Sequence, residues 1–404
     1  MKLPLKFGKK EESSRFLTVD IGSNSVKVMA FDVENTERGP VAAIVGVGKR
    51  PLLDESTRGG VIVDVEDVTK AVTLAVSTAC NGDEPITQAI FGVSGNVAYG
   101  LMTTVRVTRG SGSPISAKEV DGIFAKTYDA AHDQIQSKLL EVTGAAETVV
   151  QMVTSSVVYT KVDGKVVREP VGMQGQKLEF AIFTSFVPAY HLEVLQEVAD
   201  NAGLEITAVG STMYSLVKSL GYSKKADFDG VIMDVGGEMT EVGVVFSGGI
   251  VDTRSLDIGG THFTQELSKN MDMSFQDAEH KKIEYSYGRL AESDALLVRG
   301  YMDNLLDIWL HGVELLFQEF SGVKTFAPSV YLVGGGAELP DIYEVVSKEP
   351  WAKSIAFKSP PEFSKLSIED LKLVVDRTGK AHGLEDIIPA SLSLVFLELK
   401  GLVG

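Results

Sequence analysis

Two short glycine-containing segments of this chain read alike. They are Phe16–Asp32 (FLTVDIGSNSVKVMAFD) and Val231–Gly248 (VIMDVGGEMTEVGVVFSG). In each, an apolar run ends in an aspartate, Asp20 or Asp234, and a turn of small residues leads into a second β-branched run. This pattern predicts two strands joined by a tight turn, with the aspartate near the end of the first strand. Two copies in register, roughly 210 residues apart, indicate a duplicated domain.

The turn residues suit the binding of phosphate. Gly22, Gly236 and Gly237 can adopt backbone conformations that other residues avoid, and they let backbone N–H groups approach an anion closely. An aspartate beside such a turn can hold hydrated Mg²⁺ against phosphate oxygens. One such hairpin alone is more often an ordinary turn. Two in register predict two halves that face one nucleotide.

Composition narrows the class of protein. The chain has 404 residues, enough for two or more domains, and a net charge of −17. This acidity argues against binding nucleic acid or anionic lipid through the bulk surface. The single cysteine, Cys80, excludes an internal disulfide and fits a reducing cytoplasm. We find no secretory signal and no apolar run of the roughly 18 residues that a membrane helix needs, and we expect a cytoplasmic protein.

The order of predicted elements is that of an α/β protein. After the first hairpin we expect a strand at 41–47 and a helix at 65–80. A small α+β insert at about 86–170 follows, and it includes a strand at 86–94. A long apolar strand (176–188) and a helix (190–202) come next. The predicted elements beyond the second hairpin are helices at 261–271, 274–284 and 292–320 and a strand at 329–333 that leads into Gly334–Gly336. Met1–Ser14 mixes lysines with apolar residues and is read as a frayed tail or a weak membrane contact.

Three segments in order resemble the actin, sugar-kinase and DnaK-type ATPase superfamily. They are two phosphate loops, DIGSNSVKV from Asp20 and DVGGEMTEV from Asp234, and an adenosine loop, LVGGGAELP from Leu332. The resemblance implies an actin-like (ribonuclease H-like) duplicated two-lobe ATPase fold of the α/β class. It also implies ATP and Mg²⁺ as cofactors.

Four further segments resemble the bacterial FtsA family within that superfamily. They are GVSGN at Gly92–Asn96, EPVGMQGQKLEF at Glu169–Phe180, LDIGGTHFTQEL at Leu256–Leu267 and FQDAEHKKIEYS at Phe275–Ser286. The similarity covers essentially residues 16–399 and includes an inserted SHS2-like subdomain. PilM proteins of pilus assembly share the phosphate loops and a comparable insert, and they are the main alternative.

The resemblance implies a division of the chain and a set of site residues. The implied parts are a basic tail (1–14), a first lobe (15–85, 171–209 and 381–400), an insert (86–170), a second lobe (210–262 and 312–380) and its upper part (263–311). Asp20 and Asp234 would position Mg²⁺. The residues implied to contact the nucleotide are Gly22, Ser23, Asn24, Gly236, Gly237, Gly260 and Thr261 at the phosphates, Glu279, Lys282 and Ser286 at the ribose and adenine, and Gly334, Gly335 and Gly336 at the adenine.

The chain departs from the superfamily pattern in its second phosphate loop. Glu238 stands in place of a third glycine and Met239 in place of a threonine. A carboxylate that faces a triphosphate raises the Coulomb energy, and the threonine hydroxyl is lost. We therefore expect nucleotide binding with slow or absent hydrolysis. No catalytic base can be assigned, and the six histidines show no metal-ligand spacing.

The function implied by the resemblance is that of a bacterial division protein. Such a protein polymerises, works with other division proteins, and links filaments of FtsZ, a tubulin homologue, to the inner face of the cytoplasmic membrane. We expect the FtsZ site in the region 263–311. FtsA proteins carry a linker and a basic amphipathic helix after the ATPase body, whereas this sequence ends at Gly404. We expect either that the sequence is a piece of a longer chain or that membrane contact is supplied otherwise, for example by Met1–Lys10. The alternative is a PilM-like scaffold of pilus assembly. A sugar or acetate kinase is disfavoured because no motif for a second substrate is found.

Overall fold

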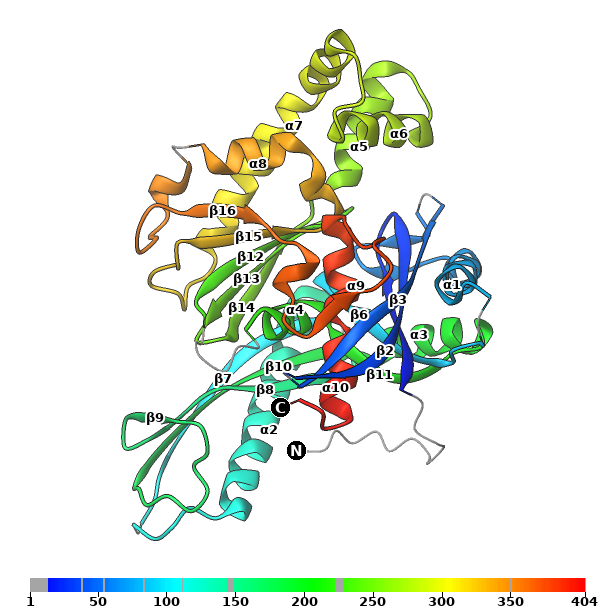
Figure 1. Ribbon diagram of the computed structural model, residues 1–404. Coiled ribbons are helices and arrows are strands. Elements are labelled where there is room, and N and C mark those ends of the chain that lie inside the picture. The colour runs from blue at the N-terminus through cyan, green and yellow to red at the C-terminus, as the bar shows by residue number, and fades with distance from the viewer. Residues whose placement is uncertain are drawn as a thin grey trace.

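The computed structural model describes residues 14–37, 39–53, 55–82, 84–110, 112–143, 148–221, 228–348 and 351–403. The predicted tail at Met1–Ser14, including Met1–Lys10, lies outside the described residues except for Ser14. Two α/β lobes lie side by side, and a narrow insert extends from their base (Figure 1).

The sheet of the first lobe contains six strands in the order β11-β6-β1-β2-β3-β17. Their bounds are β1 Arg15–Ile21, β2 Ser25–Thr36, β3 Gly39–Pro51, β6 Gln88–Val93, β11 Glu205–Ser211 and β17 Val374–Asp376. Successive residues of a strand point to opposite faces of the sheet. Leu17 and Val19 of β1 therefore pack with helices α1 (Val65–Cys80) and α3 (Ala189–Asn201). Phe16 points to the other face, where its ring stacks on that of Phe396, with centroids 3.9 Å apart.

The sheet of the second lobe repeats this arrangement. Its order is β14-β13-β12-β15-β16, with bounds β12 Gly230–Val235, β13 Thr240–Phe246, β14 Gly249–Leu256, β15 Ser329–Val333 and β16 Glu362–Lys365. In both sheets three antiparallel strands are followed by two parallel ones. The helices of this lobe are α5 Gly260–Met271, α6 Phe275–Ser286, α7 Glu292–Gln318 and α8 Pro340–Ser347. The duplication predicted from the two hairpins is therefore confirmed.

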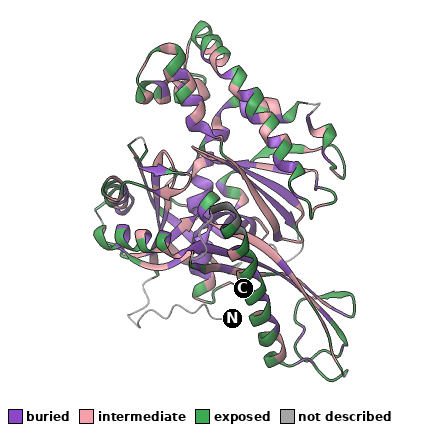
Figure 2. Ribbon diagram, turned by 180° about the vertical axis from the view of Figure 1, so that it is seen from behind, coloured by how far each residue is buried: buried purple, intermediate pink, exposed green. Residues whose placement is uncertain are grey.

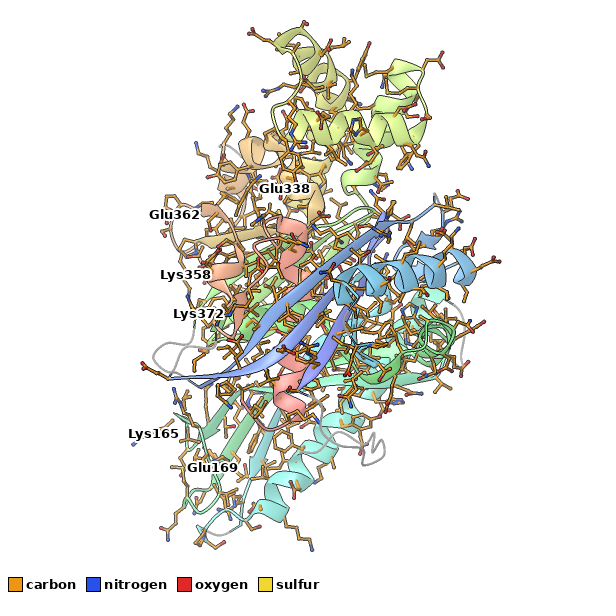
Figure 3. The ribbon with its side chains drawn as sticks, turned by 45° about the vertical axis from the view of Figure 1, so that its right-hand side comes forward. Lys165, Glu169, Glu338, Lys358, Glu362 and Lys372 are labelled. Carbon is orange, nitrogen blue, oxygen red and sulfur yellow. The ribbon has the colours of Figure 1, made fainter. Side chains whose placement is uncertain are left out.

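The insert is a four-stranded sheet covered by one long helix. The order is β7-β10-β8-β9, with bounds β7 Tyr99–Thr108, β8 Val150–Val162, β9 Lys165–Val167 and β10 Lys177–Pro188. Helix α2 (Ala117–Thr143) packs Ile123 against Phe180 and Ile182 of β10. Figure 3 shows Lys165 and Glu169 on the insert, below both lobes in this view.

The predicted limits of the insert, residues 86 and 170, differ from the limits of its sheet. Strand β6 belongs to the first lobe, where it pairs with β1 and β11. Strand β10, predicted as part of the first lobe, pairs with β7 and β8 in the insert. A continuous apolar run fits the inside of either sheet, so the sequence of β10 does not distinguish between them. Likewise β17, predicted within the second lobe, pairs with β3 of the first. The boundaries at residues 263 and 311 stay predictions.

The two lobes share a hydrophobic core at their base. Helices α4 (Thr212–Gly221), α9 (Ile387–Ser391) and α10 (Ser393–Leu399) contribute most of its helical residues. The core joins Phe16 and Phe31 of the first sheet to Ile232 and Val333 of the second. Figure 2 shows that burial is concentrated in the two main sheets and in the helices between them.

The short strands β4 (Thr57–Arg58) and β5 (Val61–Ile62) form a separate hairpin. No helix among the described residues is long and apolar enough to cross a membrane.

Candidate functional site: a junction of two glycine turns

The same backbone hydrogen bond closes the two glycine turns. In the first turn the Gly22 N–H donates to the Ser25 carbonyl at 3.1 Å. In the second turn the Gly236 N–H donates to the Met239 carbonyl at 2.8 Å. Each bond spans three residues between the end of one strand and the start of the next, as the alternation of the sequence predicts.

The two turns contact each other where the lobes meet. The Glu238 N–H donates to the Ser23 hydroxyl at 3.3 Å. The Thr261 hydroxyl donates to the Asn24 side-chain oxygen at 2.7 Å. A β-carbon added to Gly237 would lie 3.1 Å from the β-carbon of Ser23. The phosphate-loop residues predicted from the two halves of the chain are therefore brought together.

Helix α5 begins on the second turn. The Gly260 N–H donates to the Gly236 carbonyl at 2.9 Å, and the Thr261 N–H donates to the Gly237 carbonyl at 2.8 Å. A β-carbon on Gly259 would lie 2.5 Å from the Gly237 carbonyl oxygen, so only glycine fits this approach. The first turn of α5, which supplies the predicted residues Gly260 and Thr261, is thereby fixed beside both glycine turns.

The predicted adenosine loop packs on the same turn. Gly334 has a φ of +88°, and a β-carbon there would overlap with the Asp234 carboxylate. A β-carbon on Gly336 would lie 2.8 Å from the Gly236 carbonyl oxygen. Gly335 lies next to Glu385, which binds Lys49 of β3 through an ion pair of 2.7 Å.

Lys282 of α6 joins α6 to the start of α5. Its ammonium donates to the Gly260 carbonyl at 2.8 Å, to the Thr264 hydroxyl at 2.7 Å and to Glu279 at 2.7 Å. Burial lowers the pKa of Lys282, while Glu279 acts in the opposite direction. The Ser286 hydroxyl donates to the Lys282 carbonyl at 3.0 Å, within α6. Glu279 and Lys282 thus line up beside Gly260, and Ser286 lies one helical turn further on.

Carboxylates that are buried or half-buried gather beside the turns. Burial, and next the negative charge of Asp20, raise the pKa of Asp234 to about 7. Burial, and next Asp234, raise the pKa of Glu241 to about 7. Lys27 lies 3.4 Å from Asp20, and this carboxylate together with Glu385 keeps the pKa of Lys27 raised against the effect of burial. The carboxylates of Asp20 and Asp234 offer hard oxygen ligands in a region of excess negative charge, which fits Mg²⁺.

Lys27 and Glu241 were missed by reasoning from the sequence. Lys27 pairs across the first hairpin with Asp20, and Glu241 pairs across the second hairpin with Asp234. Both stand seven residues after their aspartate, and this equal spacing is the signal that could have identified them.

Gly59 was also missed. Its N–H donates to the Glu238 carboxylate at 2.6 Å, a contact between distant parts of the chain that no local pattern indicates.

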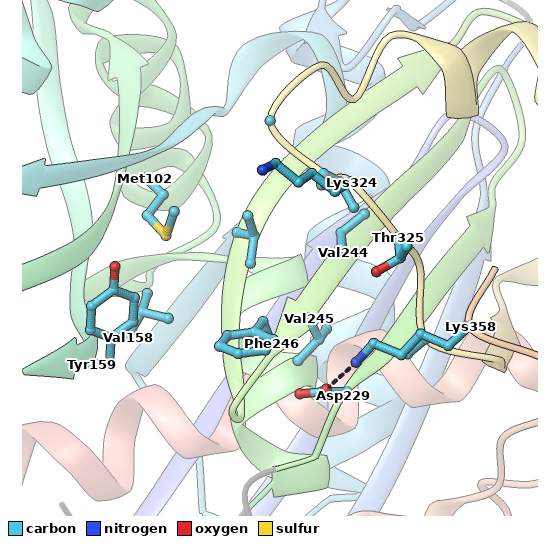
Figure 4. A pocket seen from close by; sticks show the side chains of 14 residues that line it. Met102, Val158, Tyr159, Asp229, Val244, Val245, Phe246, Lys324, Thr325 and Lys358 are labelled. Carbon is cyan, nitrogen blue, oxygen red and sulfur yellow. Dashed lines mark hydrogen bonds and ion pairs between the residues drawn. The ribbon is translucent and has the colours of Figure 1, made fainter. Parts of the chain in front are cut away.

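A cavity of about 230 Å³ lies elsewhere, between the insert and the second lobe (Figure 4). Met102 and Val158 of the insert line one side, and Val245 and Phe246 of β13 line the other. At its edge the Lys358 ammonium binds Asp229 at 3.0 Å. None of the residues described as lining it belongs to the predicted nucleotide site.

The fold and the site together define an actin-like protein, in which two lobes of the same strand order meet at paired glycine turns. Curated homologues carry the name cell division protein FtsA. That of Neisseria meningitidis serogroup B is 24% identical over 281 residues, which cover 68% of this chain and 62% of that protein. That of Streptococcus pneumoniae serotype 2 is 24% identical over 352 residues, which cover 82% of this chain and 73% of that protein. The chain thus spans about three fifths to three quarters of these relatives.

A second relationship leads to pilus assembly. The family described as type IV pilus assembly protein PilM matches residues 191–366. A solved PilM-PilN type IV pilus biogenesis complex contains a chain that superposes with a TM-score of 0.64 at 13% identity, covering 96% of this chain and 98% of that one. This likeness shows the fold. The resemblance to FtsA, with PilM as a further relative, is confirmed.

Proposed function

We propose that the chain is an actin-like, ATP-binding protein of bacterial cell division that polymerises and links FtsZ filaments to the cytoplasmic membrane. The observation that carries the proposal is the meeting of the two glycine turns, each preceded by an aspartate, at the junction of the lobes. The homologues named FtsA support the role in division.

In this proposal the backbone N–H groups of both turns hold the phosphates. The donors would come from Gly22, Ser23 and Asn24 in the first lobe and from Gly236 and Gly237 in the second, because backbone amides in such turns bind anions. Gly260 and Thr261 would lie beside the phosphates and ribose. Glu279, Lys282 and Ser286 would line the ribose and adenine, and Gly334–Gly336 would let the adenine approach bare backbone. Asp20 and Asp234 would hold Mg²⁺, which would neutralise phosphate charge.

We assign the nucleotide a structural and switching role, with weak or absent hydrolysis. Residues on both lobes would contact one ligand, so binding would favour the closed arrangement that forms filaments. At the position of a threonine in related loops, Met239 carries a thioether without a hydroxyl to donate. Partners would include FtsZ, through the region 263–311, other division proteins and further copies of the chain.

Pelleting of the purified chain with Mg-ATP, alone and with anionic vesicles, tests this proposal. The expected result is filaments that pellet, are visible by electron microscopy and retain FtsZ. The matched control is a chain with Asp20→Asn and Asp234→Asn, for which we expect no nucleotide-dependent pelleting. A protein that binds Mg-ATP and stays monodisperse under all these conditions contradicts the proposed polymer.

A specific observation favours a second function, that of a PilM-like scaffold in type IV pilus assembly. The PilM family matches 191–366, and the solved PilM-PilN complex has the same fold. A scaffold of this kind would bind nucleotide and a partner peptide without forming filaments. Retention of a pilus membrane protein on the immobilised chain, without retention of FtsZ, would select this function.

A further inference from the structure

Glu238, the residue that departs from the superfamily pattern, connects the two lobes. Its N–H donates to the Ser23 hydroxyl, and its carboxylate accepts the Gly59 N–H at 2.6 Å. Gly59 lies in the turn between β4 and β5, with a φ of +56°. The side chain therefore starts in the second phosphate turn and ends on a backbone amide of the first lobe.

The second departure, Met239, also contacts the first lobe. Its sulfur packs directly on Gly95, so that a β-carbon on Gly95 would overlap with it. Close by, the Asn96 side-chain amide donates to Asp257 at 2.9 Å. Both residues that replace the expected glycine and threonine are thus used as contacts between the lobes.

A carboxylate on a glycine-turn amide has the chemistry of a bound phosphate oxygen, because both are anions that accept a backbone N–H. Glu238 lies in the same turn as Gly236 and Gly237, which would hold phosphates. A terminal phosphate that enters this position must displace the Glu238–Gly59 hydrogen bond and lie beside a carboxylate.

We propose that the Glu238 carboxylate, which lies between the second glycine turn and the β4–β5 turn, occupies the place of the terminal phosphate, so that the site selects a nucleoside diphosphate over a triphosphate. This inference rests on the proposed nucleotide binding. A diphosphate leaves the Glu238–Gly59 contact intact, because its two phosphates need only the amides of the glycine turns. Glu238 is thus a specificity-determining residue, and its carboxylate holds the lobes together without a third phosphate.

Calorimetric titration of the full chain with Mg-ADP and Mg-ATP tests the inference in the natural protein, E238Q and E238G. The natural protein is expected to bind ADP at least tenfold more tightly than ATP. E238G should raise the affinity for ATP at least tenfold and change that for ADP less than threefold. E238Q keeps the side-chain length and removes the charge, so its affinity for ATP should fall between that of the natural protein and that of E238G.

D257N is the matched control, since it removes one negative charge from another contact between the lobes. Its ratio of ADP to ATP affinity should equal that of the natural protein. Equal affinities in the natural protein, or a parallel change for both nucleotides in E238G, would overturn the inference while leaving nucleotide binding established. If neither nucleotide binds the folded natural protein or E238G, the proposed function itself fails, together with the inference.

Hydrogen exchange of the nucleotide-free protein gives an independent measurement. The Gly59 amide should exchange at least tenfold faster in E238G than in the natural protein, because its acceptor is gone. D257N should leave that rate unchanged. An unchanged Gly59 rate in E238G would show that Glu238 does not hold the first lobe and would overturn the inference without any nucleotide.

Discussion

Asp234 and Glu241 face each other across the second hairpin, and both have a pKa raised to about 7. In the unfolded chain these groups lose their protons near pH 4, whereas in the folded protein they keep them up to about pH 7. The folded state therefore binds more protons over this interval, and its stability falls as the pH rises from about 4 to about 7.

The first prediction concerns Asp234→Asn, which stays neutral at every pH. Measured by urea unfolding in metal-free buffer, its stability relative to the natural protein should increase between pH 5 and pH 8 by on the order of 3 kcal/mol. Carboxylates of lowered pKa, such as Glu179, make the stability rise with pH in both proteins. Subtracting the stability of the natural protein from that of the variant removes this shared contribution and leaves the effect of Asp234. Asp133→Asn, at an exposed carboxylate, is the control. Parallel pH profiles for Asp234→Asn and the natural protein would contradict the prediction.

The second prediction compares two glycines of positive φ. Gly334 (φ +88°) is enclosed by Asp234 and Val235, whereas Gly379 (φ +60°) has open space where a β-carbon would lie. Alanine at Gly379 should cost about 1 to 2 kcal/mol of unfolding free energy for the backbone conformation alone. Alanine at Gly334 should cost roughly 1 to 3 kcal/mol more because of overlap, and it should abolish nucleotide binding. Equal losses of stability in the two variants, measured by urea unfolding, would show that Gly334 is not enclosed in this way.

How well the residues of the site could be predicted depends on whether their signal is local. The glycines and aspartates of both turns lie in short motifs, and the structure brings them together. Gly59 and Asn96 reach the second lobe through contacts between residues 179 and 161 positions apart. Periodicity and turn chemistry carry no information about such distant pairs, so these residues could not be predicted.

At the scale of elements, α6 is tied to α5 by one buried ammonium. Lys282 binds Glu279, Thr264 and the Gly260 carbonyl, and Thr264 also donates to Glu279. Removing the lysine leaves partly buried acceptors without their donor.

The third prediction follows from this contact. Lys282→Met should lower the free energy of unfolding by about 3 kcal/mol. The double variant Lys282→Met with Glu279→Gln should lose less than the sum of the two single changes, because they share one interaction. Chemical denaturation of the four proteins measures the coupling. Additive losses would show that the ammonium and the carboxylate do not stabilise each other.

Elements with strong local patterns were predicted closely. The helix expected at 190–202 is α3, Ala189–Asn201, and the strand expected at 176–188 is β10, Lys177–Pro188. In contrast, polar residues around Ser155 interrupt the apolar pattern of β8, which nevertheless forms one strand of 13 residues. Two irregularities in its pairing with β10 accommodate this segment. Strand β17 has only three residues, too few for a period to be recognised.

At the scale of the whole molecule, the shared core makes the lobes dependent on each other. Ile232 and Val333 of the second sheet pack in the same cluster as Phe16 and Phe31 of the first, with α10 alongside. A ligand at the glycine turns would therefore be bound between two bodies that are already joined at their base. The same core opposes separate unfolding of either lobe, because opening one lobe exposes apolar surface of the other.

The fourth prediction tests this coupling with the natural tryptophans. Trp309 and Trp351, the two tryptophans of the chain, are buried in the core of the second lobe, whereas Phe396 stacks on Phe16 beneath the first sheet. Phe396→Ala should lower the unfolding free energy by about 3 to 5 kcal/mol. Because the lobes share one core, the unfolding transitions followed by tryptophan fluorescence and by far-ultraviolet circular dichroism should both move to the same lower urea concentration. Leu399→Ala, at a partly exposed position of α10, should shift both only slightly. If the fluorescence transition of Phe396→Ala stays in place while the circular dichroism shows an earlier step, the first lobe unfolds alone and the base of the molecule works as a hinge between independent halves.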